Sequence, residues 1–126
     1  MYKVNVNSKS GYSFRVKAAN YAFDVDASGK AITPPDTLLA GLGTCIGVYI
    51  RKYAEGAKLD LGEFDINVEA DFSSEKPVSF KKIKVNIDLK NVRLEDKRKN
   101  ALLAFVKNCP VSNTLKANPD IDVRIL

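Results

Sequence analysis

The sequence predicts an α+β fold, and three patterns support this prediction. Segments in which apolar and polar residues alternate recur along the chain, as expected for strands with one buried face. A long stretch without charged residues, residues 37–50, has the spacing of a buried helix. The chain has 126 residues, of which 45% are hydrophobic, so we expect one domain over residues 1–126 with an ordinary core.

The first third of the chain predicts three short strands in an antiparallel meander. Val4 and Val6 alternate with polar residues in the first strand, and Gly11 marks the turn that follows. We expect a buried face for the alternating apolar residues of the next two strands, which are Tyr12, Phe14, Val16, Tyr21, Phe23 and Val25. Arg15 lies between two of these positions, so its side chain should point to the opposite face.

A central helix is predicted from the cap residue Thr33 to about Glu55, with Gly56 as its C-terminal stop. Threonine can cap a helix, and Pro34 suits its first position. Asp36, three residues after the cap, can reach back to the free N–H group of the cap residue. The sequence therefore predicts a capping box at this helix start.

This central helix should be covered on most sides, because no charge occurs between Asp36 and Arg51. Three glycines, Gly41, Gly43 and Gly47, lie inside it. Each costs about 1 kcal/mol of helix stability relative to alanine. We expect the close approach of another backbone, such as that of a partner subunit, to compensate for this cost.

The second half predicts a hairpin, two helices and a last strand. The hairpin strands are residues 64–72 and 83–89, and a helix over residues 94–108 should turn Leu102, Leu103, Phe105 and Val106 inward. The Cys109-Pro110 pair interrupts this helix, a short helix then runs to about Ala117, and residues 121–125 alternate like a final strand. The predicted order of elements is βββ-α-ββ-α-α-β.

Composition limits the chemistry that the chain can perform. Without histidine, it has no Ser-His-Asp triad, no Cys-His protease site and no histidine-containing zinc site. The two cysteines are too far apart for a C-x-x-C motif, and no glycine-rich phosphate loop follows a strand. We therefore expect no cofactor and no metal. The N-terminus lacks the apolar core of a signal peptide, and no apolar stretch is long enough to cross a bilayer, so a cytoplasmic location without a membrane partner is expected.

The two cysteines are the obvious candidates for catalysis. Cys109 directly precedes Pro110 at a helix start, where free backbone N–H groups and the helix dipole favour a thiolate. Cys45 lies about three turns into the central helix, so a thiolate there needs a positive group from elsewhere. Arg15 is the best candidate for that group, since Arg51 is turned away from Cys45 on the same helix. A buried, inert cysteine is the alternative interpretation of Cys45.

The segments around both cysteines resemble the OsmC/Ohr family of osmotically inducible and organic-hydroperoxide-resistance proteins. PPDTLLAGLGTC, ending at Cys45, is similar to the family's P-x-E-L-L-L-A-A-x-G-x-C, and CPVSNTL, beginning at Cys109, is similar to its C-P-[VY]-S-x-x-[LI]. An aspartate stands where the family has glutamate, and Thr37 replaces a leucine. These departures favour the OsmC-like branch and its fold, with sheets wrapped around the central helix in an intertwined homodimer.

The resemblance implies a thiol peroxidase of oxidative-stress defence. Cys45 would be the peroxidatic and Cys109 the resolving cysteine, while Arg15 and Asp36 would complete the site. The substrate would be an organic hydroperoxide, because the apolar surroundings of Cys45 suit an organic tail. A dithiol or a reduced lipoyl protein would restore the thiols.

Two other functions remain open from the sequence. A non-enzymatic dimer of the same fold could bind a small molecule or sense the redox state. The net charge of +5 is also compatible with a basic nucleic-acid-binding domain, but the lysines are scattered and acids accompany one of the two small clusters. We therefore expect no nucleic-acid partner.

Overall fold

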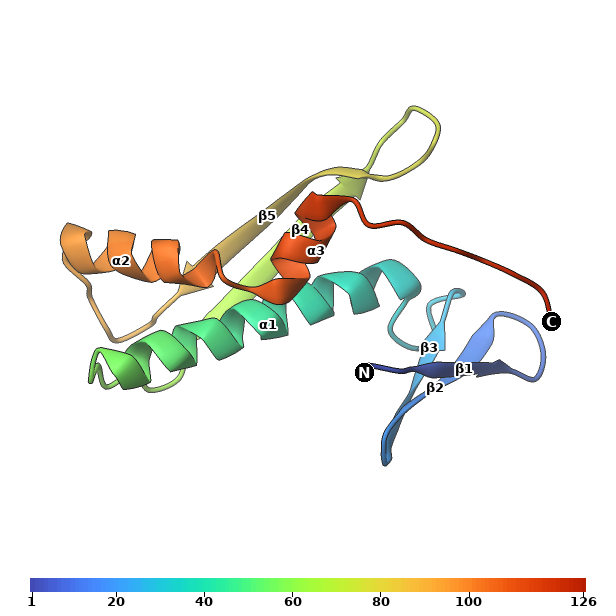
Figure 1. The fold of residues 1–126 in the computed structure, drawn as a ribbon, viewed down its shortest axis with the longest axis horizontal. Coiled ribbons are helices and arrows are strands. Elements are labelled where there is room, and N and C mark those ends of the chain that lie inside the picture. Colours follow the sequence, from blue (N-terminus) through green and yellow to red (C-terminus); the bar gives the residue numbers. More distant parts are fainter. The chain divides into compact units, whose positions relative to one another are not determined.

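The computed structural model describes all residues from 1 to 126. The chain forms two compact units, residues 1–40 and residues 41–126, which are described separately below. Figure 1 shows the elements along the chain, which follow the predicted order up to the last helix. No helix in the chain is both long enough and apolar enough to cross a membrane.

The first unit contains a three-stranded antiparallel meander of β1 (Asn5–Ser8), β2 (Ser13–Ala18) and β3 (Tyr21–Asp26). β2 lies in the middle, and its Arg15 pairs in register with Asn7 on one side and Asp24 on the other. The predicted meander is therefore confirmed, and Arg15 lies in a polar row across the sheet.

The burial predicted for the aromatic face of this sheet is only partly correct. Val16 and Val25 are buried, whereas Tyr12, Tyr21 and Phe23 are 72%, 81% and 45% exposed. A three-stranded sheet buries a face only where another segment covers it. The bridge of Ile32 to Val25 lies at the free edge of β3, so it extends the sheet rather than covering its face.

α1 (Pro34–Gly56) begins with the predicted capping box. The hydroxyl of Thr33 donates to the Asp36 carboxylate at 2.6 Å, and the backbone N–H of Asp36 faces the Thr33 hydroxyl oxygen at 3.4 Å. These contacts satisfy polar groups that a helix leaves free at its first turn. The helix start is therefore fixed by residues that are neighbours in the sequence.

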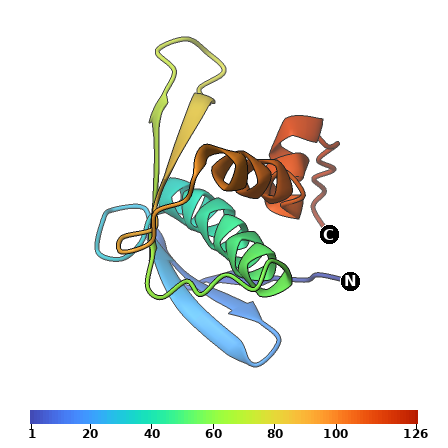
Figure 2. The ribbon, with the colours of Figure 1, turned by 90° about the vertical axis from the view of Figure 1, so that its left-hand side faces the viewer.

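The second unit is built on a hairpin of β4 (Asp65–Phe72) and β5 (Phe80–Asp88). Figure 2 shows α1 beside this hairpin, with α2 (Asp96–Val106) and α3 (Pro110–Ala117) on the same side of it as α1. The core lies between the hairpin and these helices, and its buried members are Leu42, Ile46, Ile50, Ala54, Leu61, Leu102 and Cys109. Burial of these side chains is the main source of stability for the unit.

Two glycines of α1, Gly43 and Gly47, allow close packing against side chains of the same chain. A Cβ atom on Gly43 would lie 3.0 Å from Cγ2 of Val68, and one on Gly47 would lie 3.4 Å from Cδ1 of Ile66. Both neighbours belong to β4. Gly41, by contrast, has open space next to it.

Two predictions for the C-terminal half were wrong. Residues 121–125 form no strand, because their backbone has no pairing partner in the chain, and Ile121, Val123 and Ile125 are exposed. Leu103 was expected to face inward but is 49% exposed, while its neighbour Leu102 is 3% exposed. Consecutive helical residues are about 100° apart, so one of such a pair turns away from the core.

Candidate active site

The structure brings the two cysteines together in the second unit. Cys109 is fully buried within the core cluster, and the half-buried Cys45 packs against that cluster. Both are free thiols in this structure. Two residues that lie far apart in the sequence thus form one sulfur pair, where α1 meets the start of α3.

The start of α3 positions Cys109 as the cap residue of that helix. The backbone N–H of Ser112 donates to the Cys109 sulfur at 3.5 Å, and Pro110 occupies the first helical position. The N–H of Asn113 donates to the Cys109 carbonyl at 3.0 Å, which closes the first turn. A thiol thus takes the role that serine or aspartate has in most helices, at the end of the helix where the dipole favours negative charge.

The setting of Cys45 disfavours its thiolate. Burial raises the pKa of its thiol above the usual value, and a hydrogen bond with the Cys109 thiol raises this pKa further. The backbone N–H of Val111 and the charge of Lys52 act in the other direction. At neutral pH the resting Cys45 is therefore mainly a thiol, and the groups that stabilise its anion are the first turn of α3 and one lysine.

The two sulfur atoms therefore share one helix N-terminus. Val111 offers its N–H to Cys45, and Ser112 offers its N–H to Cys109. Because the free N–H groups of a first helical turn favour anions, the same turn can stabilise a negative charge on either sulfur as it moves between them.

Arg15 lies in the first unit and has a local partner there. Its guanidinium donates to the Asp24 carboxylate at 2.9 Å, and both side chains are more than half exposed. This pair joins β2 to β3 across the sheet. The contribution of such an exposed pair to stability is small, about 0–1 kcal/mol.

Asp36 also belongs to the first unit. Its carboxylate accepts hydrogen bonds from the hydroxyl and the backbone N–H of Thr33, as its position in the capping box predicts. In this structure Arg15 therefore links two strands and Asp36 caps the start of α1.

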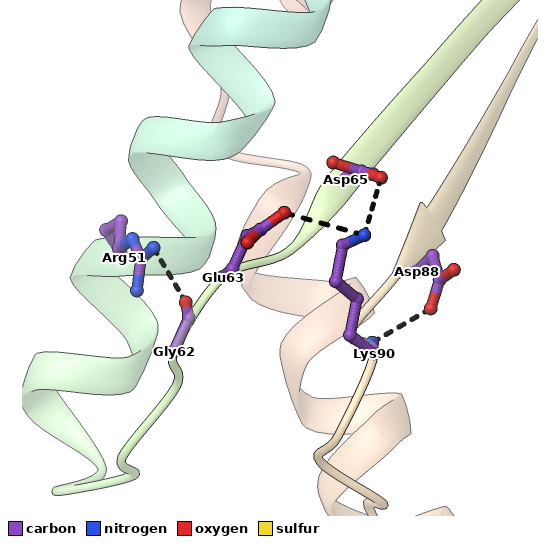
Figure 3. A network of polar contacts seen from close by, with 6 residues as sticks. All are labelled: Arg51, Gly62, Glu63, Asp65, Asp88 and Lys90. Atoms are coloured by element: carbon purple, nitrogen blue, oxygen red, sulfur yellow. Dashed lines mark hydrogen bonds and ion pairs between the residues drawn. The ribbon is translucent and has the colours of Figure 1, made fainter.

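Arg51 is engaged with the loop between α1 and β4. It donates to the carbonyls of Leu61 and Gly62 at 2.8 and 2.9 Å, and its guanidinium carbon lies 4.4 Å from the centre of the Phe64 ring. Figure 3 shows the bond to Gly62 beside the ion pairs of Lys90 with Glu63 and Asp65. Arg51 therefore fixes the turn that leads into β4, and the prediction that it faces away from Cys45 agrees with these contacts.

Sequence reasoning missed Lys52. This exposed residue follows Cys45 by seven positions, and its ammonium nitrogen lies 4.8 Å from the centre of the Tyr49 ring. The spacing was the available signal, because residues i, i+4 and i+7 share one face of a helix.

Aromatic side chains of α1 and α2 pack against one another in the second unit. The Tyr49 and Tyr53 rings of α1 lie 6.0 and 5.8 Å from the Phe105 ring of α2, both in tilted arrangements. Such contacts lie within the range in which aromatic pairs attract each other. No group of three or more metal-binding side chains occurs in the chain.

Comparison with known families identifies the family to which this chain belongs. The sequence model of the family described as "OsmC-like protein" matches residues 27–124, more than three quarters of the chain and both cysteine segments. The chain belongs to the OsmC-like family. The family expected from the two cysteine motifs is thus confirmed. A sequence search of curated proteins found no match.

Solved structures show the same fold at low sequence identity. An OsmC-like protein from Mycoplasma pneumoniae is 19% identical with a TM-score of 0.80, covering 92% of this chain and 87% of its own. Organic hydroperoxide resistance proteins from Legionella pneumophila and Elizabethkingia anophelis are 21% and 20% identical, with TM-scores of 0.66 and 0.63. These matches cover 95% and 94% of this chain, and 92% and 91% of theirs. The α+β, OsmC-like fold is therefore shown.

Proposed function

We propose that this protein is a cysteine-based peroxidase that reduces organic hydroperoxides in oxidative-stress defence. The observation that carries the proposal is the sulfur pair, in which Cys45 and Cys109 meet at the start of α3 in a member of the OsmC-like family. Two proteins with similar structures are named organic hydroperoxide resistance proteins, which supports the same chemistry for this chain.

The first step is attack of the Cys45 thiolate on the O–O bond of a hydroperoxide. The sulfur becomes a sulfenic acid, the O–O bond breaks, and the leaving alkoxide takes a proton to become an alcohol. The Val111 N–H and the Lys52 charge favour the Cys45 thiolate that this attack needs. Tyr49, which follows Cys45 by four residues and so lies on nearly the same face of α1, would give the organic tail an apolar surface.

The second step is resolution by Cys109. Its thiolate attacks the Cys45 sulfur, the S–O bond breaks, and the departing hydroxide takes a proton to leave as water, so that a Cys45–Cys109 disulfide forms. The Ser112 N–H that already bonds to the Cys109 sulfur supports this thiolate. A dithiol or a reduced lipoyl protein then exchanges with the disulfide and restores both thiols.

Arg15 and Asp36 stay in this proposal as residues that the family resemblance assigns to the site. Their role requires Arg15 to exchange Asp24 for the substrate or the thiolate, which an exposed ion pair permits at low cost. Replacement of Arg15 by Met should therefore lower kcat/KM for the hydroperoxide without unfolding the protein.

We further propose a homodimer in the cytoplasm, where the reducing environment would keep both cysteines as thiols. The exposed face of α1 supports the dimer, because it is uncharged from residue 37 to residue 50 and includes Gly41, with open space beside it, and the half-exposed Val48. The exposed apolar residues of the C-terminal segment are also available for pairing with a second copy. Light scattering after gel filtration tests this: a mass of one chain at micromolar concentration would contradict it.

Steady-state turnover with a dithiol reductant tests the peroxidase. We expect cumene hydroperoxide to be reduced faster than hydrogen peroxide, and Cys45→Ser to abolish turnover. Cys109→Ser should allow one oxidation and then stall or over-oxidise, because no thiol resolves the sulfenic acid. Normal turnover by the Cys45→Ser variant would overturn the proposal.

One observation favours the second candidate, a redox-sensing or small-molecule-binding dimer. The raised pKa of Cys45 leaves little thiolate at neutral pH, which suits a slowly oxidised sensor better than a fast enzyme. The two functions differ in rate: a sensor would form the disulfide with hydroperoxide but show negligible turnover with the reductant present.

A further inference from the structure

The Cys45 thiol lies in an apolar setting in which few charges can assist its ionisation. Cys45 packs against the core cluster together with the apolar residues Ile66 and Val68 of β4 and Val106 of α2. From α3 the titratable neighbour is Cys109, whose thiol opposes ionisation of Cys45. A positive charge close to this sulfur would therefore have an effect that solvent does not fully screen.

The second unit contains two positive side chains on the nearby turns of α1, and only one faces the sulfur. Arg51 is held by the Leu61 and Gly62 carbonyls, on another side of the helix. Lys52 follows Cys45 by seven residues, close to two helical turns, so both lie on nearly the same face.

The Tyr49 ring holds the ammonium group of Lys52 on the N-terminal side of the Lys52 Cα atom, which is the side toward Cys45. Tyr49 precedes Lys52 by three residues and follows Cys45 by four, and the Lys52 ammonium lies 4.8 Å from its ring centre. Helical side chains lean toward the N-terminus, so Lys52 extends back over the turn that separates it from the cysteine. The attraction between a cation and an aromatic face stabilises this rotamer.

We infer that Lys52, anchored on the Tyr49 ring, is a positioning cation that stabilises the anion formed at Cys45 when this sulfur reacts. The inference deepens the proposed peroxidase and rests on it for its biological meaning. The positive charge near Cys45 would then come from the central helix itself, in addition to the one expected from Arg15 in the N-terminal strands. The charge of Lys52 lowers the pKa of Cys45, which agrees with this role. Burial and the Cys109 thiol act in the other direction and raise that pKa.

The test is the pH dependence of Cys45 alkylation by iodoacetamide, followed by peptide mass mapping. With the charge about 6–10 Å from the sulfur, Lys52→Met should raise the midpoint of the pH profile by about 0.3–0.7 pH unit. Alkylation at pH 7.5 should become about twofold to fivefold slower, since only the thiolate reacts. Lys52→Arg should keep the wild-type midpoint, because it keeps a charge that stacks on aromatic rings.

Lys81→Met provides the matched control, since Lys81 is also an exposed lysine but lies on β5. This control should leave the midpoint unchanged. In 1 M NaCl, where the screening length is about 3 Å, the difference between wild type and Lys52→Met should shrink. Equal midpoints of wild type and Lys52→Met at low salt, or an equal shift in the Lys81→Met control, would each overturn the inference.

This experiment is independent of peroxide turnover. If the predicted shift occurs and the enzyme fails to reduce hydroperoxides, the proposed function fails and the role of Lys52 stands. If turnover is normal and the midpoint does not shift, the role of Lys52 fails and the proposed function stands.

Discussion

Replacement of Gly43 by alanine tests the packing of α1 against the hairpin. The added methyl would lie 3.0 Å from Cγ2 of Val68, closer than carbon atoms pack without strain. Alanine should favour the helix by about 1 kcal/mol, whereas an overpacked core costs about 1–3 kcal/mol. We therefore expect the Gly43→Ala variant to lose about 1 kcal/mol of unfolding free energy.

A double-mutant cycle separates these two effects. On a Val68→Ala background the obstructing methyl is absent, so Gly43→Ala should instead stabilise the protein by about 1 kcal/mol. Urea unfolding at a fixed protein concentration measures both values, which keeps any contribution from oligomerisation constant. If Gly43→Ala changes the stability by the same amount and sign on both backgrounds, the contact between α1 and β4 is not the reason for this glycine.

Three further predictions concern single contacts. Arg51→Met should lower the free energy of unfolding in urea by about 1–2 kcal/mol, because it removes the hydrogen bonds to two carbonyls and the contact with Phe64. An unchanged stability would show that the loop does not depend on these contacts. Thr33→Ala should cost about 1 kcal/mol and Thr33→Ser much less, because serine keeps the capping hydroxyl; equal losses measured by thermal unfolding would argue against the capping box. Hydrogen bonds from the Ser28 hydroxyl and N–H lower the pKa of Asp26 in the folded protein. The Asp26 carboxylate should therefore stabilise the fold above pH 4, and this contribution should disappear as the pH falls through the lowered pKa of the folded state. Unfolding measured from pH 6 to pH 2.5 should therefore show a weaker acid dependence for Asp26→Asn than for wild type, and identical profiles would contradict this assignment.

Sequence reasoning succeeded where the deciding interactions are local. The capping box of Thr33 and Asp36 joins residues three apart, and the break at Pro110 follows from the chemistry of proline alone. The meander and the hairpin also follow from the alternation of neighbouring residues and the turns between them. The meeting of Cys45 with Cys109 was expected only from the family resemblance, since no local pattern relates two residues so far apart.

The sequence failed where the outcome depends on a distant partner. Residues 121–125 have the alternation of a strand, but alternation cannot supply the neighbour that a strand needs for its hydrogen bonds. Lys52 was missed because its position over Tyr49 is a choice of side-chain rotamer, which residue spacing permits but does not dictate. The exposure of Tyr12 and Tyr21 likewise depends on what covers their sheet rather than on their own pattern.

The most direct test of the central claim is the product of a single oxidation. The reduced protein is treated with one equivalent of cumene hydroperoxide, quenched with an alkylating agent, and examined by intact mass and peptide mapping. Our account predicts loss of both free thiols, a disulfide that links Cys45 to Cys109, and release of cumyl alcohol in equal amount. Two alkylated thiols with the peroxide unconsumed, or oxidation confined to Cys109, would contradict it.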